Sequence, residues 1–170
     1  MGMKPEDFFE AFVCENYEDY KQHPGCLRRA FNAAVSASHL ADHYFRYYKR
    51  NDASKLAGCH KWKDFRKNLS TRPGHCFRHV RDIANAYKHL YTSEGPDKGV
   101  HSSVSSTGAI ESIRWGHENA ELREIKQDLS EDLKDGDSNE KVVFTTKHGM
   151  QLDFLPELEA VIEYWRKKVS

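Results

Sequence analysis

A long helical pattern between residues 26 and 50 constrains the fold more than any other feature of this sequence. Apolar side chains recur there at spacings of three and four residues, which places them on one side of a helix at about 100° per residue. They are Leu27, Phe31, Ala34, Val35, Ala41, Phe45 and Tyr48. We predict that this segment is the central helix of the fold.

Other segments show the same helical period. They cover residues 7–20, 54–69, 73–91 and 156–169. Pro73 and Pro156 stand where the first turn of a helix tolerates proline. Residues 141–146 and 151–154 flank a turn that contains glycine, which indicates a hairpin. The sequence therefore predicts a mainly α fold, an antiparallel bundle of four or five helices with a small β-hairpin before the C-terminal helix.

The chain has 170 residues and a mass of 19.7 kDa, enough for one domain with its own core. We predict a single domain over residues 1–170. Residues 94–108 are rich in Gly, Pro and Ser, which favours an exposed loop. Residues 118–140 are strongly acidic with a narrow apolar stripe, typical of either an extra helix or a mobile excursion. We expect residues 93–140 to form a loop and acidic excursion within the domain.

Charge is unevenly distributed along a chain whose net charge is zero. Residues 1–92 hold 16 basic and 10 acidic side chains, and residues 93–170 hold 10 and 16. Between Arg46 and Lys88, 12 Lys and Arg stand against three Asp and alternate with aromatic residues. Basic groups contact phosphates and aromatic rings stack on bases, so this stretch favours RNA or nucleotide binding. Alternatively, the basic face pairs with the acidic residues 118–140 of its own chain.

The helix predicted over residues 73–91 carries the most specific polar pattern. Arg78, Asp82, Asn85 and His89 fall on one stripe within about 40°, with Arg81 at its rim. Such a row can bind an anion, and a neighbouring carboxylate or amide can orient an imidazole that titrates near neutral pH. The alternative is an ordinary solvated helix face. The candidate ligand-binding residues are Arg78, Arg81, Asp82, Asn85, Lys88 and His89.

The run from Arg81 to Leu90 resembles the Asn-x-x-Lys-His segment of uncharacterised bacterial helical proteins and, more distantly, the signature helix of the HEPN superfamily. The resemblance implies a helical bundle, often dimeric, and in many members a metal-independent ribonuclease. Asn85 and His89 match the polar residue and the histidine of the family motif. Ala84 stands where the family has arginine, and the nearest arginine is Arg81, one turn earlier. If the chain is a ribonuclease, His89, Asn85 and Arg81 are its candidate catalytic residues.

Metal and cofactor signatures are weak or absent. His39 and His43, and likewise His75 and His79, are pairs at one-turn spacing that can chelate a metal, but neither pair carries the glutamate of a known metal-binding motif. No phosphate-binding glycine loop, dinucleotide-binding motif or nucleophile elbow is present. We therefore expect neither a metal nor a cofactor.

The sequence leaves three classes of function open. The first is a noncatalytic HEPN-like module that binds RNA, a nucleotide or a partner protein through the basic polar helix face. The second is a metal-independent ribonuclease of the toxin or defence type, and the third is a structural protein-interaction domain. Four widely separated cysteines and no secretory leader favour a reduced, cytoplasmic protein without a membrane partner. A homodimer is compatible with each class.

Overall fold

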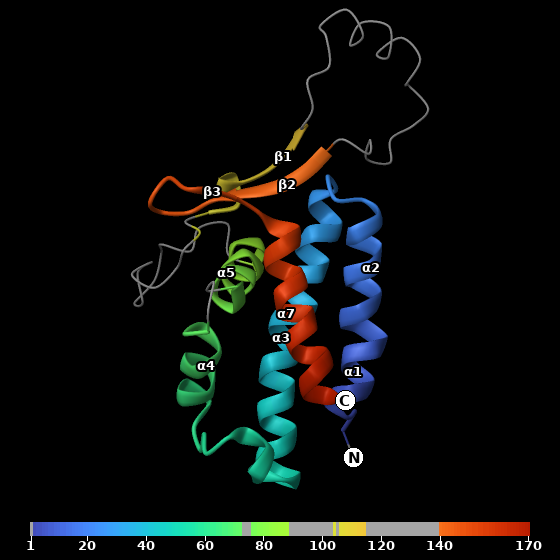
Figure 1. Ribbon diagram of the computed structural model, residues 1–170, viewed down its shortest axis with the longest axis vertical. Helices are drawn as coiled ribbons and strands as arrows, with labels where there is room; N and C mark the ends of the chain where they lie inside the picture. Colours follow the sequence, from blue (N-terminus) through green and yellow to red (C-terminus); the bar gives the residue numbers. More distant parts are fainter. Residues whose placement is uncertain (1, 73–75, 89–103, 105, 115–139) are drawn as a thin grey trace, which may run out of the picture.

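The computed structural model describes residues 2–72, 76–88, 104, 106–114 and 140–170. These residues are mainly helical, with a small three-stranded antiparallel sheet. The α-helices are α1 (Pro5–Phe8), α2 (Glu15–Gln22), α3 (Leu27–Asn51), α4 (Trp62–Ser70), α5 (Cys76–Lys88) and α7 (Phe154–Val169). In Figure 1 the sheet lies across one end of the helices, and both chain termini lie toward the other end. No helix among the described residues is long and apolar enough to cross a membrane.

The helix predicted over residues 26–50 is confirmed as α3, which the other helices surround. It contacts α2, α5 and α7, so it is buried on more sides than the single apolar face that we predicted. Five buried alanines let the neighbouring backbones approach closely, and they are Ala30, Ala33, Ala34, Ala37 and Ala41. Farther along, the Tyr44 ring packs between the rings of Phe65 and Trp165, at centroid distances of 6.0 and 5.3 Å. α3 is therefore the centre of the core.

The first predicted helix, over residues 7–20, is part of a longer helical run. α1 continues through a π-helical turn, Phe9–Cys14, directly into α2. Phe9 and Val13 of this turn are buried in the core, whereas Phe12 is exposed. A π-helical turn holds one more residue than an α-helical turn, so it changes which side chains face α3.

The prediction of one helix over residues 54–69 is wrong. The segment divides into a 3₁₀ helix, Ala53–Leu56, and α4, because Ala57 and Gly58 between them adopt left-handed backbone angles, with φ of 50° and 78°. A right-handed helix cannot continue through two such residues. The Asp52 carboxylate accepts a hydrogen bond from the Ser54 backbone N–H and caps the 3₁₀ turn. The break lets α4 change direction and pack against α5.

The predicted hairpin is confirmed, and it is joined by a strand that we did not predict. β2 (Glu140–Thr145) pairs antiparallel with β3 (Gln151–Asp153), and β1 (Ile110–Arg114) pairs antiparallel with the other edge of β2. β1 and the 3₁₀ turn before it lie inside residues 93–140, so this segment is not all loop. Residues 94–103 and 105 of the loop predicted over 94–108, and residues 118–139 of the acidic run predicted over 118–140, fall outside the described residues.

The sheet attaches to the helices through one buried face. Phe144 of β2 is fully buried against the helices, and its ring lies 5.2 Å from that of His79 on α5. α7 begins at Phe154 directly after β3, two residues before the predicted start at Pro156. The predicted apolar face of α7 is confirmed, since Leu158, Val161, Ile162 and Trp165 are buried.

Gly25, in the turn between α2 and α3, is expected to be intolerant of a side chain. A Cβ at this position would lie 2.3 Å from the Glu140 Cβ and 3.2 Å from the Glu140 carbonyl carbon, and rotation of the Glu140 side chain moves neither atom. We expect Gly25→Ala to lower the free energy of unfolding by about 1–3 kcal/mol, a typical cost of overpacking, as measured by urea denaturation. Gly108→Ala is the control, because its Cβ would lie 3.6 Å from the Ser106 Oγ. Equal stability of the two variants would contradict this close approach.

Candidate functional site

The predicted site residues lie on two different sides of α5. Arg81, Asn85 and Lys88 line a pocket between α3, α4 and α5. The side of α5 that faces this pocket is therefore rotated by roughly 70° about the helix axis from the predicted row, at 100° per residue. Asp82 lies off the pocket and is only 1% exposed. His89 lies outside the described residues, so its position relative to Asn85 stays a prediction.

Asp82 is an internal anchor for two arginines. The Nε and Nη2 of Arg81 donate hydrogen bonds to the Asp82 Oδ1 at 3.0 and 2.7 Å, and the Arg78 Nε lies 3.8 Å from Oδ2. Burial of a carboxylate requires such compensation, because an unpaired charge in the interior is costly. The expectation that Asp82 belongs to an accessible polar row is corrected by this burial. The carboxylate is buried and holds Arg78 and Arg81 in place.

Arg81 connects the anchor to the pocket. Its Nη1 donates to the Ser70 Oγ at the end of α4, at 3.4 Å, so one guanidinium bridges α5 and α4. A guanidinium has five N–H donors, of which the contacts to Asp82 and Ser70 use three. Contacts with the described residues leave the other two donors unused, on a side chain that lines the pocket and is already held in position.

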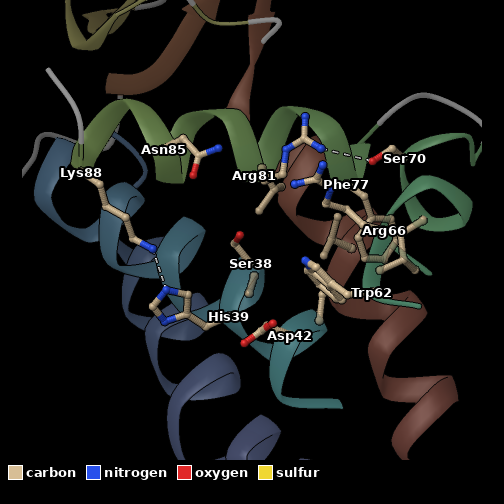
Figure 2. Close-up of a pocket in the computed structure, with 15 residues that line it drawn as sticks. Ser38, His39, Asp42, Trp62, Arg66, Ser70, Phe77, Arg81, Asn85 and Lys88 are labelled. Carbon is tan, nitrogen blue, oxygen red and sulfur yellow. Dashed lines mark hydrogen bonds between the residues drawn. The ribbon is translucent and has the colours of Figure 1, made fainter. Parts of the chain in front are cut away.

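The pocket has a volume of about 300 Å³, at the lower end of the range for small-molecule sites. Figure 2 shows Arg81 and Asn85 on one side of it, Ser38 and Asp42 of α3 opposite them, and the Trp62 ring from α4 forming a wall. At its far end Lys88 reaches across to His39. Apolar side chains complete the lining, and they are Ala37, Ala41, Leu69, Phe77, Val80 and Val161.

Positive charge predominates in the lining. Arg66, Arg81 and Lys88 contribute three cations, and Asp42 is the one acid. Asp42 already forms an ion pair with Arg46, at 2.7 Å. Arg66 makes no ion pair or hydrogen bond with any residue in the part of the chain that the structure describes. Arg81 is paired with Asp82, whereas Arg66 and Lys88 have no carboxylate partner among the described residues, so this concave site favours an anion.

His39 is the neutral member of the site. The Lys88 Nζ lies 2.7 Å from the His39 Nε2, and an ammonium only donates, so the imidazole nitrogen must be the acceptor. Burial, and then the positive charge of Lys88, lower the pKa of His39 from 6.5, while Asp42 acts weakly in the opposite direction. His39 is therefore uncharged at neutral pH and positions the ammonium of Lys88.

Trp62 gives the pocket a rigid aromatic wall. Its ring packs 5.6 Å from the ring of Phe45 and 6.0 Å from that of Phe65, so two aromatic side chains support it from α3 and α4. Trp62 and Arg66 belong to the basic, aromatic stretch that the sequence singled out, but neither was predicted as a site residue. The helical pattern of α4 was visible in the sequence, whereas its placement against α5 was not.

The histidines weighed as metal ligands have other contacts. The His43 Nε2 lies 2.8 Å from the Met3 carbonyl oxygen, and the His79 Nδ1 lies 2.8 Å from the Glu157 Oε2. His75 falls outside the described residues. Within the described ranges, no group of three or more His, Cys, Asp or Glu side chains is placed to hold a metal ion.

Ala84 occupies the position at which the HEPN motif has arginine, and it is 1% exposed. Its Cβ therefore faces the core rather than the pocket. Comparison of the chain with protein-family models, with curated proteins and with solved structures gives no match. The geometry of the pocket is thus the ground on which a function can be argued.

Asp82→Asn is expected to destabilise the fold more than loss of an exposed acid. The substitution removes the charge that compensates two arginines and should lower the free energy of unfolding by about 3–5 kcal/mol. The control is Asp42→Asn, which removes a solvent-exposed ion pair worth about 1 kcal/mol or less. Urea denaturation of both variants makes the comparison. Similar losses of stability in the two variants would show that Asp82 is not the anchor.

His39 should titrate below pH 6.5 in the folded chain, as measured by NMR of its imidazole resonances. Because its folded pKa is lowered, its stabilising contribution is complete above pH 6.5 and is lost as the pH falls from 6.5 through the folded value. Lys88→Met removes the second cause, so the pKa should rise but stay below 6.5, since burial remains. The Lys88→Met substitution should leave the resonances of His148, in the turn between β2 and β3, unchanged. A His39 pKa above 6.5 in the unsubstituted chain would exclude the proposed acceptor role.

Proposed function

We propose that this chain is a noncatalytic, HEPN-like helical module that binds a nucleotide, free or as part of an RNA, in the pocket between α3, α4 and α5. One observation carries the proposal: Arg66, Arg81 and Lys88 converge with Trp62 on a single pocket. Cationic side chains recognise the phosphate of a nucleotide, and an indole stacks on its base.

Two cations of the pocket are held in position by other side chains before a ligand binds. Arg81 offers two remaining N–H donors and Lys88 an ammonium held by His39, so little side-chain freedom is lost when a phosphate enters. Arg66 has no partner to give up among the described residues. Asn85 and Ser38 add neutral donors and acceptors for the sugar or the base edge. The separation of cationic from neutral groups in the pocket favours a ligand that carries charge at one end and a flat ring at the other.

Two observations favour binding over cleavage. Ala84 cannot supply the arginine of the HEPN motif, and it faces the core. Arg81, the nearest substitute, spends three of its donors on Asp82 and Ser70. A partner protein remains the alternative ligand, but a pocket of about 300 Å³ suits a small group better than a helix or strand of a protein.

We also propose that the helices form an antiparallel bundle of the HEPN kind. α2 and α3 are joined by a short turn, a connection typical of antiparallel neighbours, and α3 packs against α5 and α7 as well. A homodimer and a cytoplasmic location stay predictions of the sequence.

Arg66→Met tests the proposal without breaking an ion pair or hydrogen bond to any of the described residues. The loss of a charge-assisted hydrogen bond should weaken binding of a ribonucleoside 5′-monophosphate roughly 10- to 150-fold. Isothermal titration calorimetry with all four nucleotides measures the effect at fixed salt. Lys167→Met, an exposed cation of α7 outside the pocket, is the matched control and should bind as the unsubstituted chain does. Equal affinity of the two variants, or no binding by the unsubstituted chain, would reject the proposal.

Incubation with RNA separates binding from catalysis. We expect a labelled RNA to remain intact in the presence of chelator at high protein excess. Metal-free cleavage that His89→Ala abolishes would replace the proposed function with the ribonuclease alternative.

A further inference from the structure

A second hollow adjoins the pocket at Asp42 and Trp62. It has a volume of about 410 Å³ and lies along the C-terminal half of α3. Its lining consists of Asp42, Phe45, Arg46, Lys49, Arg50 and Trp62. Asp42 and Trp62 belong to both hollows, so the two are neighbours that share a wall.

We propose that this second hollow is a subsite for further phosphates of a single-stranded nucleic acid, and that Trp62 is the stacking platform between the two hollows. The inference rests on the proposed function of the first pocket. It deepens that function, because of the two ligands proposed there, a free nucleotide and an RNA, it selects the strand.

The charge of the second hollow repeats that of the first. Arg46, Lys49 and Arg50 are exposed cations, and Asp42 is again the one acid in the lining. Asp42 is paired with Arg46, which leaves Lys49 and Arg50 as the cations without a carboxylate partner among the described residues. The Lys49 ammonium lies over the Phe45 ring, 5.7 Å from its centre, and both side chains line the hollow. Each hollow therefore has a surplus of positive charge.

The spacing suits more than one nucleotide. From Asp42, which lines both hollows, to Arg50 in the second, α3 rises about 12 Å at 1.5 Å per residue. Successive nucleotides of a stacked strand rise about 3.4 Å. Four stacked nucleotides span about 10 Å, so a short strand can extend from the first hollow along the second.

Trp62 is placed to separate two bases. It lines both hollows, and its ring packs against those of Phe45 and Phe65. Alternation of an aromatic platform with cations is the arrangement by which proteins bind single strands without regard to sequence. An acidic peptide would satisfy the cations but would leave the exposed indole face without a stacking partner.

The test compares ligands of increasing length. Fluorescence anisotropy measures the affinity of labelled uridine monophosphate, the tetranucleotide of uridine and the tetranucleotide of deoxythymidine at several salt concentrations. The double variant Lys49→Met/Arg50→Met removes the excess positive charge of the second hollow. Arg66→Met removes one positive charge of the first pocket. Arg166→Met/Lys167→Met, two exposed cations in the last turn of α7, is the control that deletes the same charge elsewhere.

We expect the tetranucleotides to bind at least about ten-fold more tightly than the monophosphate. Lys49→Met/Arg50→Met should weaken tetranucleotide binding roughly ten-fold and reduce its salt slope by about 1.4, or 0.7 for each lost phosphate contact. The same variant should change monophosphate binding less than two-fold. Trp62→Leu should weaken both tetranucleotides, and tighter binding of the uridine strand than of the deoxythymidine strand would identify RNA as the source.

Failure of the subsite and failure of the proposed function give different results. If Arg66→Met weakens monophosphate binding but tetranucleotides bind no more tightly, the subsite is rejected and the proposed function stands. If no nucleotide of any length binds, both are rejected. If polyglutamate displaces the tetranucleotide as effectively as RNA and Trp62→Leu has no effect, the surface recognises charge alone, which also overturns the subsite.

Discussion

The arrangement of the site depends on the contacts of the buried Asp82 carboxylate with two arginines. This carboxylate compensates Arg78 and Arg81 on its own helix, and through Arg81 it reaches Ser70 at the end of α4. One acid thereby fixes a cation at the pocket and ties two helices together. Because burial without a partner would be costly, the pair holds its geometry before any ligand arrives.

Beside this anchor, the pocket holds two cations, Arg66 and Lys88, that have no carboxylate partner among the described residues. Lys88 is oriented by an uncharged His39, so its positive charge remains available. Arg66 projects from α4, and the rings of Phe45 and Phe65 stiffen Trp62. The zero net charge of the chain thus conceals a local surplus of cations beside an aromatic wall, which is the combination that phosphates attached to flat rings require.

Periodicity in the sequence was sufficient for α3, α7 and the β2–β3 hairpin, because burial of a regular apolar face decides those elements. It was insufficient where tertiary contacts decide. The left-handed residues Ala57 and Gly58 divide a pattern that looks continuous, and the direction of α4 after that break brings Trp62 to the pocket. A helical wheel also treats Asp82 as exposed, since it counts polarity and cannot register an internal ion pair. His89 lies outside the described residues.

The most direct measurement of the central claim is a titration of the ¹⁵N-labelled protein with uridine monophosphate, followed by NMR. We expect the indole N–H resonance of Trp62 and the backbone resonances of Arg66, Arg81 and Lys88 to shift on titration. All four should saturate with the same dissociation constant. The indole resonance of the buried Trp165 should stay in place. Saturable shifts confined to other surfaces, or none at all while the ligand is in excess, would contradict the account.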